Sequence, residues 1–177
     1  TAADNRRLAA FFAEIADALQ SAHDAGVLHR DVQPKNVLVD DHGRPHLIDF
    51  GLARLLDEPS QTRSGELAGT PYYMSPEQVR AHRAGLDHRT DVYSLGVVMY
   101  EVLTGVRPFD GQTSQQVMDR IVRDVAVPMN RHNKAVPVDL VTICLKTLEK
   151  RPEERFASAS ELSAELRRVA ADLPILT

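Results

Sequence analysis

The first part of the chain has its apolar residues mostly three or four positions apart, the period of one helix face. They are Leu8, Phe11, Phe12, Ile15, Leu19 and Ala22. Asp4 is suited to cap the start of this helix and Gly26 to end it. We therefore predict a helix between Asp4 and Gly26.

Two short apolar runs follow, over residues 36–40 and 45–50, and Asp41-His42-Gly43 separates them. This turn composition predicts a small β-hairpin. Residues 52–77 have weak periodicity and several prolines and glycines. We expect this segment to be a long irregular loop, and loops of that length inside a domain are usually functional or disordered.

Helical patterns dominate the remainder, over residues 91–104, 113–123, 138–148 and 160–173. The first of these is strongly apolar and predicts a buried central helix that ends at Gly105. In the last, Leu162, Leu166, Val169 and Leu173 repeat at spacings of three and four and are predicted to be core. The pattern as a whole predicts a mainly α fold with one small β-hairpin.

Composition narrows the classes of function. The 177 residues are 43% hydrophobic and 26% charged, as in ordinary globular proteins. The net charge of −4 gives no electrostatic footprint for nucleic acid. No apolar run reaches membrane-spanning length. The single cysteine, Cys144, excludes an internal disulfide and is predicted to be a buried structural thiol. The histidines other than His29 lack metal-ligand spacing.

The candidate chemistry lies in His29-Arg30-Asp31-Val32-Gln33-Pro34-Lys35-Asn36 and in Asp49-Phe50-Gly51. Asp31 and Asn36 are five residues apart on one predicted loop, and Asp49 arrives on the next strand. Three such oxygen-bearing side chains can converge on one point, and Mg²⁺ prefers hard oxygen ligands of this kind. Phosphoryl transfer needs mainly metal-neutralised phosphates and an oriented hydroxyl nucleophile.

These residues resemble the H-R-D-x-x-x-x-N and D-F-G signatures of protein kinases. Three further segments resemble the same family in the same order. Residues 69–77 resemble its substrate-side loop, with Ser75-Pro76-Glu77 in place of A-P-E, and residues 91–96 resemble the start of its central helix. Residues 150–156 resemble the segment whose arginine pairs with the A-P-E glutamate. The chain is thus similar to the C-terminal lobe of a eukaryotic-like, bacterial-type Ser/Thr protein kinase, an α+β fold. Residues 1–173 would form this lobe, and residues 174–177 would begin a linker.

The resemblance implies a role for each matching residue. Asp31 would orient or deprotonate the substrate hydroxyl, Asn36 and Asp49 would hold Mg²⁺ on ATP, and Leu38 would pack beneath the adenine. The implied regulatory residues are Arg30, which would meet a phosphorylated loop, and Thr62, Ser64 and Thr70. Thr62 and Ser64 are the candidate phosphorylation sites, and Thr70 would hydrogen-bond toward Asp31. The implied structural residues are His29, Phe50 and Asp91, which form an internal column, and the buried pair Glu77 and Arg155. Tyr72 and Tyr73 would either shape the substrate groove or pack in the core.

One position departs from the family pattern. The Ser/Thr kinases have a lysine two residues after the catalytic aspartate, where this chain has Gln33. An amide brings no charge to a transition state rich in negative charge. Lys35, four residues after Asp31, stands where tyrosine kinases have an arginine. We therefore count Gln33 and Lys35 among the catalytic candidates, with Lys35 supplying the missing cation.

The resemblance also implies partners and leaves alternatives open. The chain contains no glycine-rich loop and no strand lysine of a kinase N-lobe, so we expect the isolated chain to need that lobe and to be nearly inactive alone. The implied function is ATP-dependent phosphorylation of Ser or Thr in protein substrates. The implied location is the cytoplasm, which is compatible with a longer parent protein anchored to the membrane by a segment outside this chain. A pseudokinase scaffold or interaction domain, a small-molecule phosphotransferase and a purely structural helical domain are the alternatives.

Overall fold

The computed structural model describes residues 1–50, 54–55, 71–80 and 86–177. Helices carry most of the regular structure in this part of the chain: α1 (Ala2–Asp24), α2 (Pro76–Val79), α3 (Arg89–Thr104), α4 (Ser114–Arg123), α5 (Val138–Thr147) and α6 (Ala159–Ala170). Short 3-10 turns are η1 (Pro34–Asn36), η4 (Met129–Arg131) and η5 (Pro152–Glu154). The strands are β1 (Val27–Leu28), β2 (Val37–Val39), β3 (Pro45–Leu47) and β4 (Arg54–Leu55). The predicted mainly α fold with a small hairpin is confirmed.

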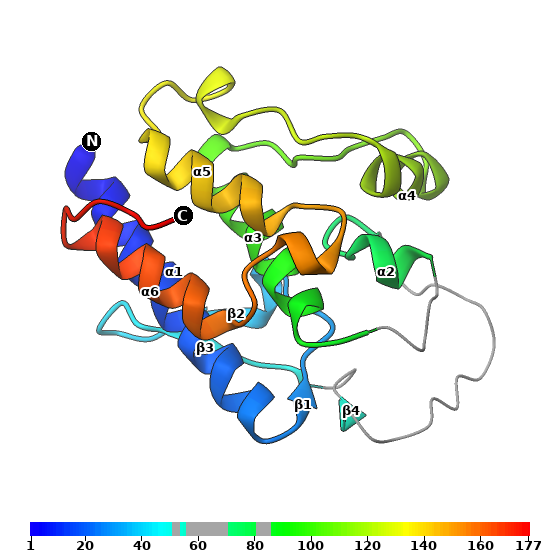
Figure 1. Ribbon diagram of the computed structural model, residues 1–177, viewed down its shortest axis with the longest axis horizontal. Helices are drawn as coiled ribbons and strands as arrows, with labels where there is room; N and C mark the ends of the chain where they lie inside the picture. The colour runs from blue at the N-terminus through cyan, green and yellow to red at the C-terminus, as the bar shows by residue number, and fades with distance from the viewer. Residues whose placement is uncertain (51–53, 56–70, 81–85) are drawn as a thin grey trace.

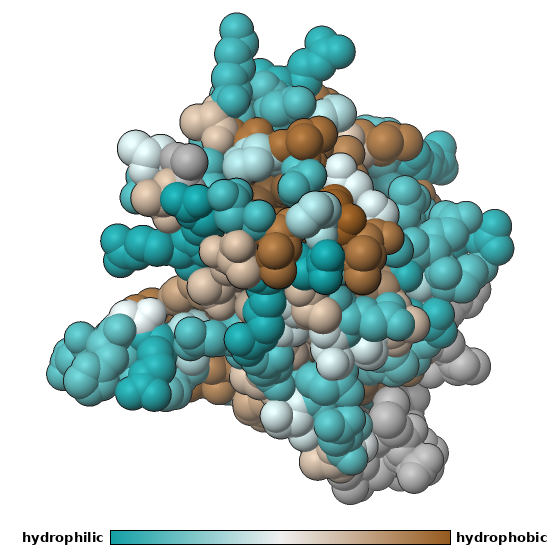
Figure 2. All heavy atoms as spheres, turned by 60° about the vertical axis from the view of Figure 1, so that its left-hand side comes forward, coloured by the Kyte–Doolittle hydropathy of each residue, from teal (hydrophilic) through white to brown (hydrophobic). Residues whose placement is uncertain are grey.

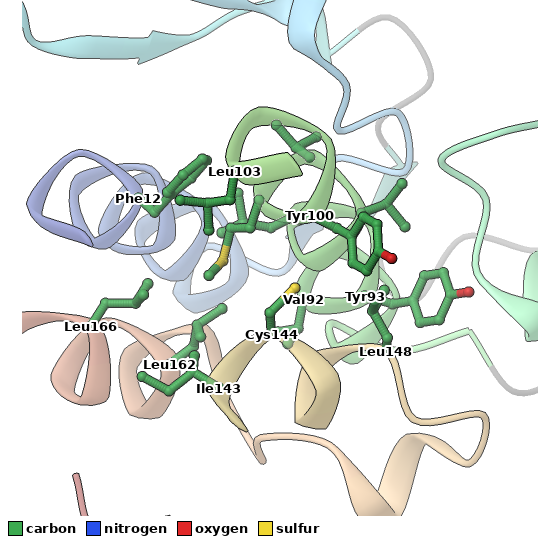
Figure 3. Close-up of a cluster of buried hydrophobic side chains, with 14 of the residues drawn as sticks. Phe12, Val92, Tyr93, Tyr100, Leu103, Ile143, Cys144, Leu148, Leu162 and Leu166 are labelled. Atoms are coloured by element: carbon green, nitrogen blue, oxygen red, sulfur yellow. The ribbon is translucent and has the colours of Figure 1, made fainter. Parts of the chain in front are cut away.

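The core lies among α1, α3, α5 and α6. Figure 1 shows α1 and α6 lying side by side, with α3 in the centre of the molecule and α5 above it. Figure 3 shows the buried side chains of these four helices pointing toward one another, and the fully buried ones include Tyr93, Tyr100, Ile143 and Leu162. Cys144 is buried there as predicted, and desolvation raises the pKa of its thiol. The central position of α3 explains why its sequence is apolar on nearly every face.

The cap of α1 differs from the prediction. Thr1, not Asp4, is the N-cap, and its hydroxyl accepts a hydrogen bond from the backbone N–H of Asp4. Asp4 is the third residue of a capping box, in which its side chain bonds back to the cap. The helix therefore begins at Ala2, before Asp4. Thr1 and Asp4 are both residue types that cap helices, so the sequence could not show which of the two is the cap.

The predicted hairpin is present with shorter strands. β2 and β3 pair antiparallel, with Val37 opposite Leu47 and Val39 opposite Pro45. In the turn, the Asp40 carboxylate accepts hydrogen bonds from the backbone N–H groups of His42 and Arg44. Gly43 has a φ of 77°, a left-handed conformation that glycine adopts at little cost. These bonds fix the turn and with it the register of both strands.

Two features of the predicted loop region are regular instead. β4 pairs antiparallel with β1, with Val27 opposite Leu55, and α2 begins at Pro76, after the N-cap Ser75, whose side chain forms a capping box with Gln78. Two-residue strands carry no readable period, which is why neither β1 nor β4 was predicted. The rest of the predicted loop up to residue 70, apart from β4, lies outside the described residues.

The end of α6 corrects one core prediction. Leu162 and Leu166 are fully buried, but Leu173 is 51% exposed. The helix stops at Ala170, and Asp172 adopts a left-handed φ of 59°. This turn takes Leu173 off the helix face that the spacing had continued.

The surface is polar over much of its area. Figure 2 shows a patch of apolar side chains bordered by hydrophilic ones on the face that it presents. Across the described residues, the large apolar side chains that are more than half exposed are Leu38, Val39, Val125, Val138, Leu173 and Leu176. Among the described helices, none has the length and apolar character needed to cross a membrane.

Gly96 allows α3 and α5 to approach closely. A Cβ added at Gly96 would overlap the Thr147 hydroxyl and lie 2.7 Å from Thr147 Cβ. We expect Gly96→Ala to lower the free energy of unfolding of the chain by about 1–3 kcal/mol, the usual effect of overpacking a core. Thermal or urea unfolding monitored by circular dichroism measures this loss. Gly96→Ala combined with Thr147→Gly should recover part of it, and an unchanged stability of the single variant would contradict the packing described.

Candidate active site

The loop that carries the candidate chemistry is fixed to α3 by one buried carboxylate. Asp91, in the first turn of α3, is fully buried. Its Oδ2 accepts a hydrogen bond from the backbone N–H of His29 at 2.9 Å, and its Oδ1 accepts one from the N–H of Arg30 at 2.8 Å. The His23 Nε2 atom of α1 lies 2.8 Å from the same Oδ2. Asp91 therefore joins α1, the loop and α3 at one point.

The backbone of Arg30 is held in an unusual conformation at both ends. Its φ is 65°, in the left-handed region that costs a non-glycine residue about 1–2 kcal/mol. Its N–H donates to Asp91, and its carbonyl accepts a hydrogen bond of 3.0 Å from the Gln78 side chain of α2. These two hydrogen bonds offset the strain. Because they hold the backbone of Arg30 on both sides, they also fix where the next residue, Asp31, begins.

The His29 imidazole connects this loop with the D-F-G segment. Its Nε2 lies 3.0 Å from the Ile48 carbonyl, and its Nδ1 accepts a hydrogen bond of 3.3 Å from the backbone N–H of Asp31. Since Nδ1 accepts, the proton must be on Nε2, which donates to Ile48. The ring also packs on Phe50, with centroids 4.5 Å apart. His29 thus contacts both Phe50 and Asp91, and the role of the three residues as an internal column stays a prediction.

The Asp31 carboxylate is oriented by two neutral amides. Asn36 Nδ2 donates to Asp31 Oδ2 at 3.0 Å and to the Asp31 backbone carbonyl at 2.8 Å. The Gln33 side-chain amide donates to Asp31 Oδ1. Asn36 is buried, whereas Asp31 is partly exposed. Asp31 is therefore a fixed hydrogen-bond acceptor on the surface of the loop.

Asp49 comes directly after Ile48, the residue that joins the D-F-G segment to Asn36 through a backbone hydrogen bond. The Ile48 N–H donates to the Asn36 carbonyl at 2.9 Å, so the residue after Ile48 lies next to Asn36 along the chain path. Asp49 is exposed and has a left-handed φ of 61°. Such φ values are uncommon for non-glycine residues, and Arg30 and Asp49 in this candidate site both have them.

The oxygen atoms of this site fit a metal ion held together with phosphates. Within the described residues the Asn36 side chain uses Nδ2 for both of its hydrogen bonds, which leaves its Oδ1 as an acceptor. An amide oxygen and an exposed carboxylate are the donor types that Mg²⁺ takes when phosphates supply most of its ligands. In the described part of the chain there is no cluster of three His, Cys, Asp or Glu side chains able to bind a metal without such phosphates.

The other predicted site residues are distributed around this centre. Lys35 is an exposed residue of η1, and Leu38 is a residue of β2 with 53% of its side chain exposed. Neither is brought into a described contact with Asp31. Thr62, Ser64 and Thr70 lie outside the described residues, so their predicted roles stay predictions.

Glu77 and Arg155 form a buried ion pair below α2. Two parallel hydrogen bonds join Arg155 Nη1 and Nη2 to the Glu77 carboxylate at 2.7 and 2.8 Å. Thr90 also donates to Glu77, at 2.8 Å, and Arg155 donates to the carbonyl groups of Arg89 and Glu149. Burial raises the pKa of Glu77, but the Arg155 bonds and charge lower it by more, so the pKa lies below its ordinary value. The pair joins α2 to the start of α3 and to the end of η5.

The sequence analysis missed several residues that position this site. His23 contacts Asp91 from α1, and Gln78 and Thr90 bond to Arg30 and Glu77. A lone histidine or glutamine carries no sequence signal for such a role. For Gln78 a weak signal existed, since Ser75 and Gln78 match the capping-box spacing.

The comparisons with known proteins show the family of the chain. The family model described as the protein kinase domain matches residues 1–166. A probable serine/threonine-protein kinase of Clostridium acetobutylicum is 40% identical over 156 residues, which are 88% of this chain and 23% of that protein. The serine/threonine-protein kinase PknB of Mycobacterium leprae is 40% identical over 163 residues, which are 92% of this chain and 26% of that protein.

The chain therefore belongs to the protein kinase domain family, and the relatives it resembles are bacterial serine/threonine-protein kinases. It spans about a quarter of the length of these curated relatives. The predicted family is confirmed.

The Glu77–Arg155 pair gives a stability prediction. We expect Glu77→Gln to lower the free energy of unfolding by about 3–5 kcal/mol, because it leaves the Arg155 charge buried without its partner. The matched control is Glu153→Gln, which removes an exposed carboxylate paired with Arg151 and should change stability little. Urea unfolding of the three chains measures the difference, and equal losses for both variants would contradict the burial of the pair.

The same pair fixes the sign of a pH effect. The pKa of Glu77 is lowered from 4.5 in the folded chain, so its contribution is fully present above that pH and is lost as the pH falls through the folded value. The stability gap between the natural chain and Glu77→Gln should therefore be constant at neutral pH and shrink below pH 4.5.

Proposed function

We propose that the protein carrying this chain transfers the γ-phosphoryl group of ATP to serine or threonine residues of protein substrates. The observation that carries the proposal is the Asp31 carboxylate, held by the amides of Gln33 and Asn36 on a loop that Asp91 fixes to α3. We assign residues 1–173 to the C-terminal lobe of the kinase domain and residues 174–177 to the start of a linker.

Asp31 would act on the acceptor hydroxyl. A partly exposed carboxylate with both oxygens oriented can accept the hydroxyl proton and aim the oxygen at the phosphorus atom. The hydrogen bonds from Asn36 and Gln33 hold both carboxylate oxygens in one orientation. Asp31 would thus position the nucleophile, which is most of what a protein contributes to phosphoryl transfer.

Asn36 and Asp49 would hold the metal ion of Mg-ATP. Bound there, Mg²⁺ would neutralise the phosphate oxygens and leave the γ-phosphoryl group open to attack. Asn36 is suited to this because its Nδ2 bonds to Asp31 already fix the direction of its Oδ1. One amide side chain would therefore couple the position of the metal to that of Asp31.

Gln33 and Lys35 would divide the role of one lysine. Gln33 keeps the contact with the catalytic carboxylate but carries no charge. Lys35, exposed on the same loop, would supply the positive charge to the transferred phosphate. Gln33 is also the feature that favours the second candidate function, a pseudokinase that binds nucleotide or partners without transferring phosphate.

An N-terminal kinase lobe would complete the nucleotide site. Leu38, Val39, Ile48 and Phe50 expose between 36% and 57% of their side chains around the hairpin and the D-F-G segment. Apolar side chains grouped in this way mark a surface that another unit covers. The isolated 177-residue chain is therefore expected to bind ATP weakly and to be nearly inactive.

Substitution of Asp31 tests the proposal. In the complete natural protein, Asp31→Asn should lower the rate of phosphate transfer to a protein substrate by about 10²–10⁴-fold, the usual contribution of a general base. Transfer from radiolabelled ATP measures the rate, and Mg-ATP binding by calorimetry should stay within a few-fold of the natural protein. The control is Asp41→Asn, an exposed turn residue, which should leave both unchanged. A natural protein that binds Mg-ATP but transfers no phosphate would favour the pseudokinase.

The role of Lys35 has its own test. Lys35→Ala should lower kcat for phosphate transfer by about tenfold, since about 1.4 kcal/mol of transition-state stabilisation corresponds to that factor. Gln33→Lys in the same background should restore the rate, because it returns the cation to the family position. Lys134→Ala, another exposed lysine, is the control. An unchanged kcat for Lys35→Ala would remove Lys35 from the catalytic residues.

A further inference from the structure

A second ion pair, less buried than Glu77–Arg155, lies beside the segment before α2. Arg107 follows α3, and its guanidinium carbon lies 3.6 Å from the ring centroid of Tyr72. Its Nε is 3.4 Å from Glu101 Oε1, and Glu101 Oε2 accepts a hydrogen bond of 2.6 Å from the Tyr73 hydroxyl. We name Tyr72, Tyr73, Glu101 and Arg107 the Arg107 cluster.

The cluster belongs to the substrate side of the domain. Tyr72 and Tyr73 stand in the segment that resembles the substrate loop of kinases, and the Ser94 hydroxyl of α3 donates to the Tyr73 carbonyl at 2.7 Å. The segment is thereby fixed to α3, and both tyrosine rings are partly exposed. Tyr72 contacts Arg107 and Tyr73 contacts Glu101 of α3, and both residues are also partly open to solvent. Whether they shape a substrate groove stays a prediction.

The charges of the cluster can be reached by a ligand. The side chains of Arg107 and Glu101 are 29% and 27% exposed, whereas those of Arg155 and Glu77 are 0% and 9% exposed. Without Arg107, the Glu101 carboxylate would stand unbalanced at this surface. Asp110, whose charge also acts on the Arg107 guanidinium, would add to the negative potential. Such a surface attracts a cationic side chain of a partner.

We propose that Arg107 is a specificity-determining residue, which by pairing with Glu101 and covering Tyr72 removes a binding site for a basic substrate side chain next to the substrate loop. The inference rests on the proposed function, since it concerns the peptide that the kinase accepts. The natural protein then selects peptides whose side chain at this place is neutral or acidic, and loss of Arg107 opens the place to lysine or arginine.

The test compares matched peptides on the complete natural protein. Each pair shares one serine acceptor and differs at one neighbouring position, arginine against glutamine, and the readout is the ratio of the two kcat/KM values. Arg107→Met should raise this ratio at one position by about fivefold, the factor given by an ion pair of about 1 kcal/mol. Arg107→Lys should keep the natural ratio, and Arg107→Met with Glu101→Gln should return to it. Arg131→Met, an exposed arginine outside the cluster, is the control.

The outcomes separate a specific role from a structural one. Equal losses of kcat/KM for both peptides of every pair would show that Arg107 only supports the fold and would overturn the inference. If Arg107→Met does not fold, Glu101→Gln alone decides, because it frees the Arg107 charge and should raise the preference for glutamate over glutamine peptides by a similar factor. An unchanged preference there overturns the inference as well.

Binding measurements keep this inference distinct from the proposed function. Fluorescence anisotropy gives the affinity of the same peptides for each variant without phosphate transfer. A protein that binds with the expected ratios but transfers no phosphate overturns the proposed function alone. Transfer with unchanged ratios overturns the specificity role alone, and a protein that neither binds nor transfers overturns both.

Discussion

The structure depends on the burial of the Asp91 carboxylate. A fully buried charge is costly unless its oxygen atoms are hydrogen-bonded, and Asp91 meets this condition only when α1, the loop after β1 and the start of α3 come together. His29 and Arg30 contribute backbone N–H groups, and His23 contributes its ring. Any displacement of the loop would leave a buried acceptor unpaired, so the position of Asp31 is tied to the stability of the core. The active-site loop is in this sense part of the fold rather than an addition to it.

The D-F-G segment is also held by residues that make more than one contact. The His29 ring accepts from the Asp31 N–H, donates to the Ile48 carbonyl and packs on Phe50, so one side chain connects the loop of residues 29–36 with the D-F-G segment. Asn36 repeats this pattern with its amide on Asp31 and its carbonyl on the Ile48 N–H. Two polar residues thus transmit the position of one segment to the other. The left-handed conformations of Arg30 and Asp49 are tolerated because the neighbouring bonds determine the backbone on both sides.

Two ion pairs flank α2 and the segment before it, and their burial separates their roles. Arg155 and Glu77 are almost completely shielded, and Arg155 also donates to several backbone carbonyls, so the two charges act on the fold. Arg107 and Glu101 are partly open to solvent and contact the tyrosines of the substrate segment. A shielded pair holds the segment in place, and an exposed pair presents a charge pattern to whatever binds there. Both are Arg–Glu pairs, and the difference between their roles comes from how far water reaches each pair.

The sequence by itself determined the helical architecture, the hairpin and the family, because helical periodicity, turn composition and the His29–Asn36 and Asp49–Gly51 motifs are local in the chain. It also named Asp31, Asn36 and Asp49 as a set, and their roles stay predictions. The folded structure was needed to show that Thr1 caps α1, that Leu173 leaves the core, that β1 pairs with β4, and that His23 and Gln78 bond to Asp91 and Arg30. The Thr1 cap and the turn at Asp172 are local choices that composition leaves open. The pairing of β1 with β4 and the bonds of His23 and Gln78 depend on contacts between residues that are far apart in the sequence, such as His23 with Asp91. No spacing rule records such contacts, since they arise only when burial and hydrogen bonding must be satisfied together in three dimensions.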